Sequence, residues 1–161
     1  MTEFSRKILA VSDESEECRM ALIYAGHRCK AVGAGLVVLR CARMPGVGGW
    51  IGLDKDISED AMDAARLKAN EHLKMVEERT GVAAELVMSE DEPQDAIRKL
   101  VDADKSIRQL VLASGSGRWG PGPLVARLGK GRMLAERPIA VTVVPGEVTD
   151  REIDEMGGVA S

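Results

Sequence analysis

Aromatic side chains are scarce in this chain of 161 residues, where Phe, Trp and Tyr together make up 2%. Proteins that bind single-stranded nucleic acid commonly stack the bases on aromatic rings, so a stacking surface of that kind is not expected. The formal net charge of −4 also argues against a general nucleic-acid binder, which needs a surplus of cations to meet phosphates. We therefore expect no nucleic-acid partner and an aliphatic core.

Cysteine is also rare, and its three copies, Cys18, Cys29 and Cys41, form neither a CxxC pair nor a metal-ligand spacing. Free cysteines of this kind are usually small buried hydrophobes in a reducing compartment. No apolar run approaches the roughly 20 residues that a membrane span needs. No signal-peptide pattern precedes the first apolar run. These features predict a cytoplasmic protein with no membrane partner and no metal.

Apolar residues are plentiful at 45%, and with 30% charged residues this composition is typical of one globular domain. Continuous apolar runs predict strands at residues 7–12, 36–42, 83–88, 109–113 and 139–144. Helical periodicity predicts helices at about residues 15–29, 58–80, 92–101 and 123–136. Strands and helices that alternate in this way indicate an α/β fold, a doubly wound open sheet of five parallel strands with helices on both faces.

The loop after the fourth strand, Ser114–Pro123, is the most distinctive stretch of the chain because it contains four glycines. Glycine-rich backbone can direct several N–H groups toward one anion, usually a phosphate. In a doubly wound sheet the ligand lies outside the carboxyl ends of the strands, which is where this loop falls. The alternative is a flexible surface turn.

Several segments carry a resemblance to one family. Ile8–Ser15 is similar to "I-L-V-x-x-D-G-S", Ser114–Gly120 to "G-S-R-G-R-x-G" and Pro138–Val144 to "P-V-x-V-V". These are motifs of the universal stress protein family, which the chain resembles over about residues 6–146. The resemblance implies a Rossmann-like sheet with strand order 3-2-1-4-5. Residues 1–146 are expected to form a single domain. Residues 147–161 are expected to form a flexible acidic tail after it.

The resemblance also implies a site for ATP with Mg, marked in the family by G-x2-G-x9-G-[S/T]. Gly117 and Gly120 match the first half of this motif. Lys130 stands where the third glycine is expected, between Gly129 and Gly131, and no Ser or Thr follows. Glu14 replaces a glycine of the first loop.

By the same resemblance, Asp13 would lie near the base or ribose and Cys41 near the adenine. The phosphates would meet Gly115, Gly117, Gly120, Gly129, Lys130 and Gly131. Two alternatives stay open at these positions. Asp13 suits an Asx turn that leads into the first helix, and Cys41 suits the core.

The resulting hypothesis is an adenine-nucleotide-binding regulatory module of stress response, with no or slow ATP hydrolysis. No catalytic residue is expected, because His27 and His72 lack matching acid and base partners in the sequence and Ser116 lacks the G-x-S-x-G context. The alternative is a dimeric interaction protein of the same fold that binds no nucleotide. In either case the apolar last strand predicts a homodimer, because an uncovered sheet edge invites pairing. The protein partner is not identified by the sequence.

Overall fold

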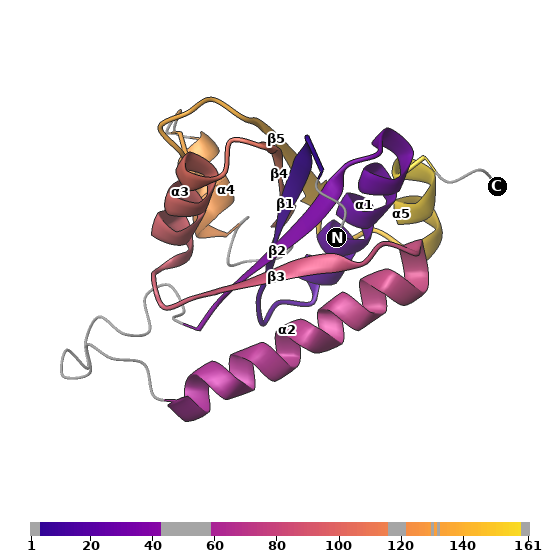
Figure 1. Cartoon of the computed structure of the whole chain (residues 1–161). Helices are drawn as coiled ribbons and strands as arrows, with labels where there is room; N and C mark the ends of the chain where they lie inside the picture. Colours follow the sequence, from indigo (N-terminus) through magenta and orange to yellow (C-terminus); the bar gives the residue numbers. More distant parts are fainter. Residues whose placement is uncertain (1–3, 43–58, 116–121, 130, 132, 159–161) are drawn as a thin grey trace.

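Five parallel strands form one sheet between two layers of helices (Figure 1). The computed structural model describes residues 4–42, 59–115, 122–129, 131 and 133–158. The strands are β1 (Lys7–Ser12), β2 (Gly35–Cys41), β3 (Ala84–Ser89), β4 (Ile107–Ser114) and β5 (Ala140–Pro145). The helices are α1 (Glu17–Val32), α2 (Glu59–Thr80), α3 (Pro93–Ala103), α4 (Pro123–Gly129) and α5 (Asp150–Met156). The order β3-β2-β1-β4-β5, with every pair parallel, confirms the predicted topology.

The sheet divides the core into two halves because successive side chains of a strand point to opposite faces. Ile8 and Ala10 of β1 pack toward α1, α2 and α5, together with Val76 and Ile153. The alternate residues of β1 pack toward α3 and α4 with Ile97. The central strands are buried on both faces, which explains their continuous apolar runs.

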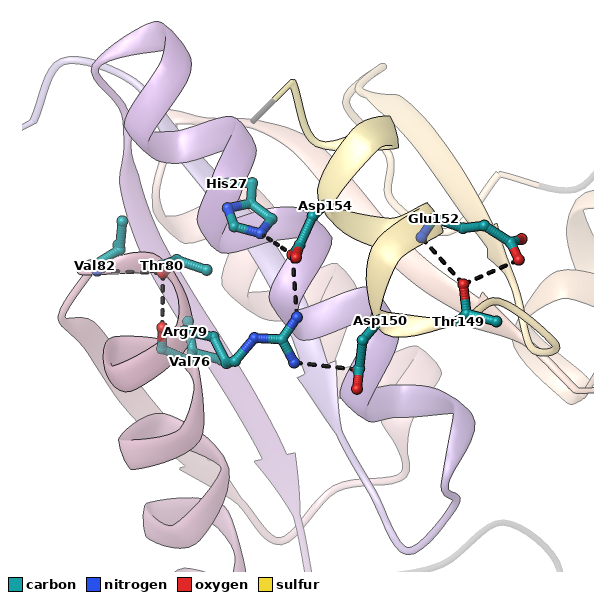
Figure 2. Close-up of polar contacts among 9 residues, drawn as sticks. All are labelled: His27, Val76, Arg79, Thr80, Val82, Thr149, Asp150, Glu152 and Asp154. Carbon is teal, nitrogen blue, oxygen red and sulfur yellow. Dashed lines mark hydrogen bonds and ion pairs between the residues drawn. The ribbon is translucent and has the colours of Figure 1, made fainter. Parts of the chain in front are cut away.

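The C-terminal segment differs from the expected loose tail, because residues 150–156 form helix α5 against α1 (Figure 2). Thr149 caps this helix by accepting a hydrogen bond from the Glu152 N–H at 3.1 Å. Ile153 of α5 is fully buried. The sequence from 150 to 156 therefore belongs to the packed domain.

Polar contacts fix α5 to the α1–α2 layer. Asp154 of α5 bonds to His27 Nε2 of α1 at 2.8 Å and accepts from Arg79 Nη2 of α2 at 3.0 Å (Figure 2). Arg79 Nη1 also donates to Asp150 at 3.1 Å. One arginine thus binds two carboxylates of α5, and the histidine next to them is 6% exposed.

Helix α4 is shorter than predicted and ends at Gly129 rather than near residue 136. Gly131 follows with φ 75°, a left-handed conformation that favours glycine and stops a helix. Its N–H donates to the Leu128 carbonyl at 2.9 Å. Leu134 and Ala135 are buried in the irregular stretch beyond it, which leads back into β5.

Arg137 ties this returning stretch to the junction between α3 and β4. Its Nη2 lies within hydrogen-bond distance of the carbonyl oxygens of Val101, Asp104 and Ile107, at 2.8, 3.1 and 2.8 Å. These carbonyls lie where α3 ends and β4 begins, and that of Asp104 also accepts from the Ile107 N–H at 3.2 Å. A single guanidinium therefore links the stretch before β5 to the end of α3 and the start of β4.

Candidate functional site

The candidate site lies at the carboxyl edge of the sheet, between β1 and β4. From β1 the chain continues to β2 and β3 on one side, and β4 and β5 occupy the other side. The strand order reverses between β1 and β4, and open α/β sheets bind their ligands in the crevice at such a switch point. Asp13 follows β1 and Gly115 follows β4, while Cys41 ends the neighbouring β2. The topology brings these three predicted residues to one edge.

Asp13 forms the Asx turn that the sequence left as an alternative. Its Oδ1 accepts hydrogen bonds from the Ser15 N–H at 2.7 Å and from the Ser15 hydroxyl at 2.5 Å. The Ser15 hydroxyl in turn accepts from the Cys18 N–H at 3.3 Å, at the first turn of α1. The turn holds the Asp13 carboxylate in a fixed position at the edge of the crevice.

Cys41 is 7% exposed and packs in the core half that faces α3 and α4. Burial raises the pKa of its thiol to about 12, and the nearby Asp91 carboxylate acts in the same direction. The thiol is therefore neutral at physiological pH. The core interpretation of this residue is confirmed, and any contact with a ligand would be apolar or through the backbone.

The predicted phosphate-binding residues divide into two groups. Gly117, Gly120 and Lys130 lie outside the described residues. Gly129 is the last residue of α4, six residues after Pro123 and so about 9 Å further along the helix axis. The Gly131 N–H donates a hydrogen bond to the Leu128 carbonyl at the end of α4. In this conformation the Gly131 N–H is not available to an anion.

A buried polar network that sequence reasoning missed lies next to the Asp13 loop, on the α2 side of the sheet. Ser12 Oγ and His72 Nδ1 are 2.7 Å apart, and Arg40 Nη1 donates to Ser12 Oγ at 3.3 Å. Arg40 Nη2 also donates to the Glu14 carboxylate. Ser12, Arg40 and His72 are 1%, 2% and 7% exposed. A single arginine within an otherwise apolar strand was the sequence signal, since buried charges are paired.

Both histidines therefore have partners, contrary to the prediction. Burial lowers the pKa of His72, and the Arg40 guanidinium lowers it further. Because the neutral ring can accept, Ser12 can donate its proton to Nδ1 while it accepts from Arg40. The arrangement resembles a nucleophile with its base, but Ser12 is 1% exposed, so its hydroxyl is covered in this conformation.

The sequence model of the universal stress protein family matches residues 5–122, which is most of the sheet together with α1, α2 and α3. This chain belongs to the universal stress protein family. The comparison with curated protein sequences finds no match.

Solved structures support the fold of this universal stress protein. UspA from Lactobacillus plantarum is 18% identical with a TM-score of 0.66, and the alignment covers 89% of this chain and 99% of that one. A universal stress protein from Archaeoglobus fulgidus, solved in complex with dAMP, is 18% identical with a TM-score of 0.59 and coverages of 86% and 95%. Another universal stress protein, solved with cAMP, is 18% identical with a TM-score of 0.55 and coverages of 86% and 96%.

The described part of this universal stress protein shows no group of three or more His, Cys, Asp or Glu placed to hold a metal ion. Within the same residues, no helix is both long and apolar enough to cross a bilayer. A cavity of about 550 Å³ lies between the carboxyl ends of α1, α2 and α5, and Lys30, Arg79 and Gly157 line it.

Proposed function

We propose that this protein is a regulatory module of stress response that binds an adenine nucleotide in the crevice between β1 and β4. The observation that carries the proposal is the placement of Asp13 and Gly115 at the carboxyl ends of two neighbouring central strands, at the switch point. Family membership supports it, as do the relatives solved with dAMP and cAMP.

The Asp13 carboxylate fits a role at the base or ribose. Among the described residues its hydrogen bonds all go to Oδ1, so Oδ2 keeps lone pairs that can accept from a ribose hydroxyl or an amino group. Glu14, which adds a negative charge to the same loop, is bound by Arg40 of β2, on the far side of β1 from β4. That contact limits its repulsion of a phosphate in the crevice.

The phosphates would be held by backbone N–H groups of Gly115, Gly117 and Gly120, with Lys130 as the nearby cation. Gly129 and Gly131 remain part of this proposal only if the chain after α4 rearranges on binding, because Gly131 donates to Leu128 here. Mg would enter with ATP and would neutralise part of the phosphate charge. Hydrolysis is expected to be slow or absent, because none of the described polar side chains at the crevice is placed as a general base.

Isothermal titration with Mg-ATP tests the proposal. We expect measurable binding to the wild type, unchanged binding to Ser116→Ala, and at least about tenfold weaker binding to Gly117→Val or Gly120→Val, because a Cβ blocks the approach of the phosphate to the backbone. Lys130→Glu should weaken binding through charge repulsion. The absence of both heat and a thermal shift at millimolar Mg-ATP would contradict nucleotide binding.

A second function, a dimeric interaction protein without nucleotide, is favoured by the apolar edge strand β5. Val143 of β5 is 38% exposed, whereas the other edge strand, β3, carries Glu85 with a side chain that is 60% exposed. Charged edges resist pairing and apolar edges favour it. We propose that β5 pairs with β5 of a second copy, whether or not the protein binds a nucleotide.

Light scattering at micromolar concentration tests this pairing. We expect a dimer for the wild type, a monomer for Val143→Glu, and a dimer for Val32→Glu, which changes an equally exposed valine at the end of α1. A monomeric wild type would contradict the proposal. The three buried free cysteines support a reducing, cytoplasmic location for either function.

A further inference from the structure

The guanidinium of Arg40 is the most deeply buried cation in the described part of the chain that faces a carboxylate. Its side chain is 3% exposed, whereas that of Glu14, the carboxylate which it binds, is 57% exposed. A buried charge needs a counter-charge because water cannot solvate it. Here the counter-charge is a side chain that can rotate into solvent without disturbing the core.

Among the residues that the structure describes, the donors of Arg40 are also incompletely used. Glu14 offers one oxygen, Oε1, to Nη2, and Ser12 takes Nη1. The Nε group is buried and has no hydrogen-bond partner among the described residues. A guanidinium binds carboxylate and phosphate best through two parallel hydrogen bonds, which the contact with Glu14 does not provide. An oxyanion with several oxygens would satisfy this group better than Glu14 does.

The groups around Arg40 complete a small polar site. Ser12 supplies a hydroxyl and His72 an imidazole, both buried. Lys68 and Arg19 are close enough to lower the pKa of His72, and each also contacts an acid of its own helix or cap. Asp13 is the opposing charge nearby. The site lies on the α2 side of the sheet, whereas Cys41 faces α3 and α4, so it borders the crevice at the loop that carries Asp13.

We propose that Arg40, Ser12 and His72 form a second anion site, and that Glu14 occupies this site as an internal carboxylate that a small oxyanion, such as a phosphate group, displaces. The side chain of Glu14 then turns into solvent, and the phosphate oxygens bond to Nε and Nη2 of Arg40. The proposal does not depend on nucleotide binding in the crevice.

Phosphate titration followed by NMR of the histidine rings tests the proposal, because the chain has only two histidines. The ring signals are assigned with His27→Asn and His72→Asn. Inorganic phosphate is added at pH 7.5, with chloride at matched ionic strength as the reference. The His72 signal should shift and saturate with phosphate, and the His27 signal, from the α5 contact, should not move.

The Glu14→Gln variant decides the role of Glu14, because it removes the internal carboxylate and leaves the core unchanged. We expect it to bind phosphate at least about tenfold more tightly than the wild type, as a charge-assisted hydrogen bond no longer has to be replaced. The matched control is Glu16→Gln, which removes the same charge two residues away at a side chain that is 90% exposed. The control should change the affinity less than twofold.

Two further arms complete the experiment. Arg40→Lys keeps the charge but lacks the fork of donors, so it should lose phosphate binding while the His27 signal reports an intact fold. AMP in place of inorganic phosphate distinguishes a nucleotide phosphate from the free ion as the source of the oxyanion. An unmoved His72 signal in Glu14→Gln at tens of millimolar phosphate would overturn the proposal, as would equal gains in Glu14→Gln and Glu16→Gln.

Discussion

The two histidines of this chain are both buried, but their hydrogen-bond partners differ. His27 lies under α5 and faces the Asp154 carboxylate, which also binds Arg79. His72 lies on α2 and faces the neutral Ser12 hydroxyl, with the Arg40 cation behind it. The hydrogen bond with His27 is the main cause of the lowered pKa of Asp154, whereas burial and Arg40 lower the pKa of His72 itself.

The difference teaches that the partner of a buried ring acts together with burial in setting which charge its surroundings favour. At His27 the contact includes the Asp154 carboxylate, and this anion also binds the Arg79 guanidinium. At His72 the cation is part of the contact, so the network favours a neutral ring and an added anion. The first arrangement fastens a helix, and the second leaves the Nε of a paired, buried arginine without a hydrogen-bond partner among the described residues.

The largest expected effect comes from the apolar anchor of the His27 contact. Ile153→Ala should lower the free energy of unfolding by about 3 kcal/mol, because Ile153 is fully buried and the neighbouring helices cannot close the cavity. Urea unfolding followed by circular dichroism measures this change. Met156→Ala, at a position that is 44% exposed, should stay within about 0.5 kcal/mol. Equal effects of the two variants would mean that α5 is not packed as described.

The pH dependence of stability separates the two histidine contacts. Because the pKa of His72 is lower in the folded state than in the unfolded chain, the unfolded chain binds the proton more readily. The stability from His72 is therefore complete above its unfolded pKa, about 6.5, and is lost as the pH falls below that value. One such group contributes at most about 1.4 kcal/mol per pH unit.

Urea unfolding at pH 7 and pH 5 should therefore show a loss in the wild type that His72→Gln reduces. Asp154 has a lowered pKa too, so its contribution is present above its unfolded value, near 3.8, and is lost only below that pH. Asp154→Asn should leave the change between pH 7 and pH 5 intact. A wild-type slope that Asp154→Asn removes, and His72→Gln does not, would contradict the comparison.

The ion pairs of Arg79 should have a smaller effect. Its side chain is 30% exposed, and the carboxylates of Asp150 and Asp154 are 68% and 39% exposed. Solvent screens contacts of this kind, so Arg79→Met should cost about 1 kcal/mol or less. High salt should reduce the cost further, and thermal unfolding at low and high salt measures both. A loss above 3 kcal/mol would show that Arg79 is structurally essential to α5.

The smallest expected effect is the reaction of the three buried cysteine thiols with a labelling reagent. Burial raises the pKa of Cys18, Cys29 and Cys41 to about 12 each. Compared with an exposed thiol, the thiolate population at pH 7.5 is lower by on the order of a thousandfold. Ellman's reagent should label the native protein very slowly and the unfolded protein fully. Single-cysteine variants should show Cys18 and Cys41, near the crevice, labelled before Cys29 if that end opens more readily.

Much of the fold could be predicted from the sequence, because buried parallel strands produce apolar runs, and such runs are clearest in the central strands β1, β2 and β4. The β1 bounds, Lys7–Ser12, agree with the prediction. The strand order also depended on the family resemblance, since periodicity alone does not specify which strands are neighbours. Asp13 was predictable as a turn residue from local chemistry, and the structure confirms its Asx turn.

The errors have two physical causes. Some local signals were present and were passed over, such as the capping box of Thr149 and Glu152 before α5, and Arg40 within an apolar strand. Other contacts have no local signal, because Ser12 and His72 are 60 residues apart and His27 and Asp154 are 127 apart. The early end of α4 belongs to the first group, since two glycines flank Lys130.

The contacts of Arg137 also constrain the order in which the protein can be completed during synthesis. The ribosome makes α3 and β4 before residue 137, so the carbonyls of Val101, Asp104 and Ile107 emerge without this donor. Until the later segment arrives, water takes the place of the Arg137 guanidinium at this junction. The nascent chain therefore gains these contacts only when the stretch leading into β5 has left the ribosome.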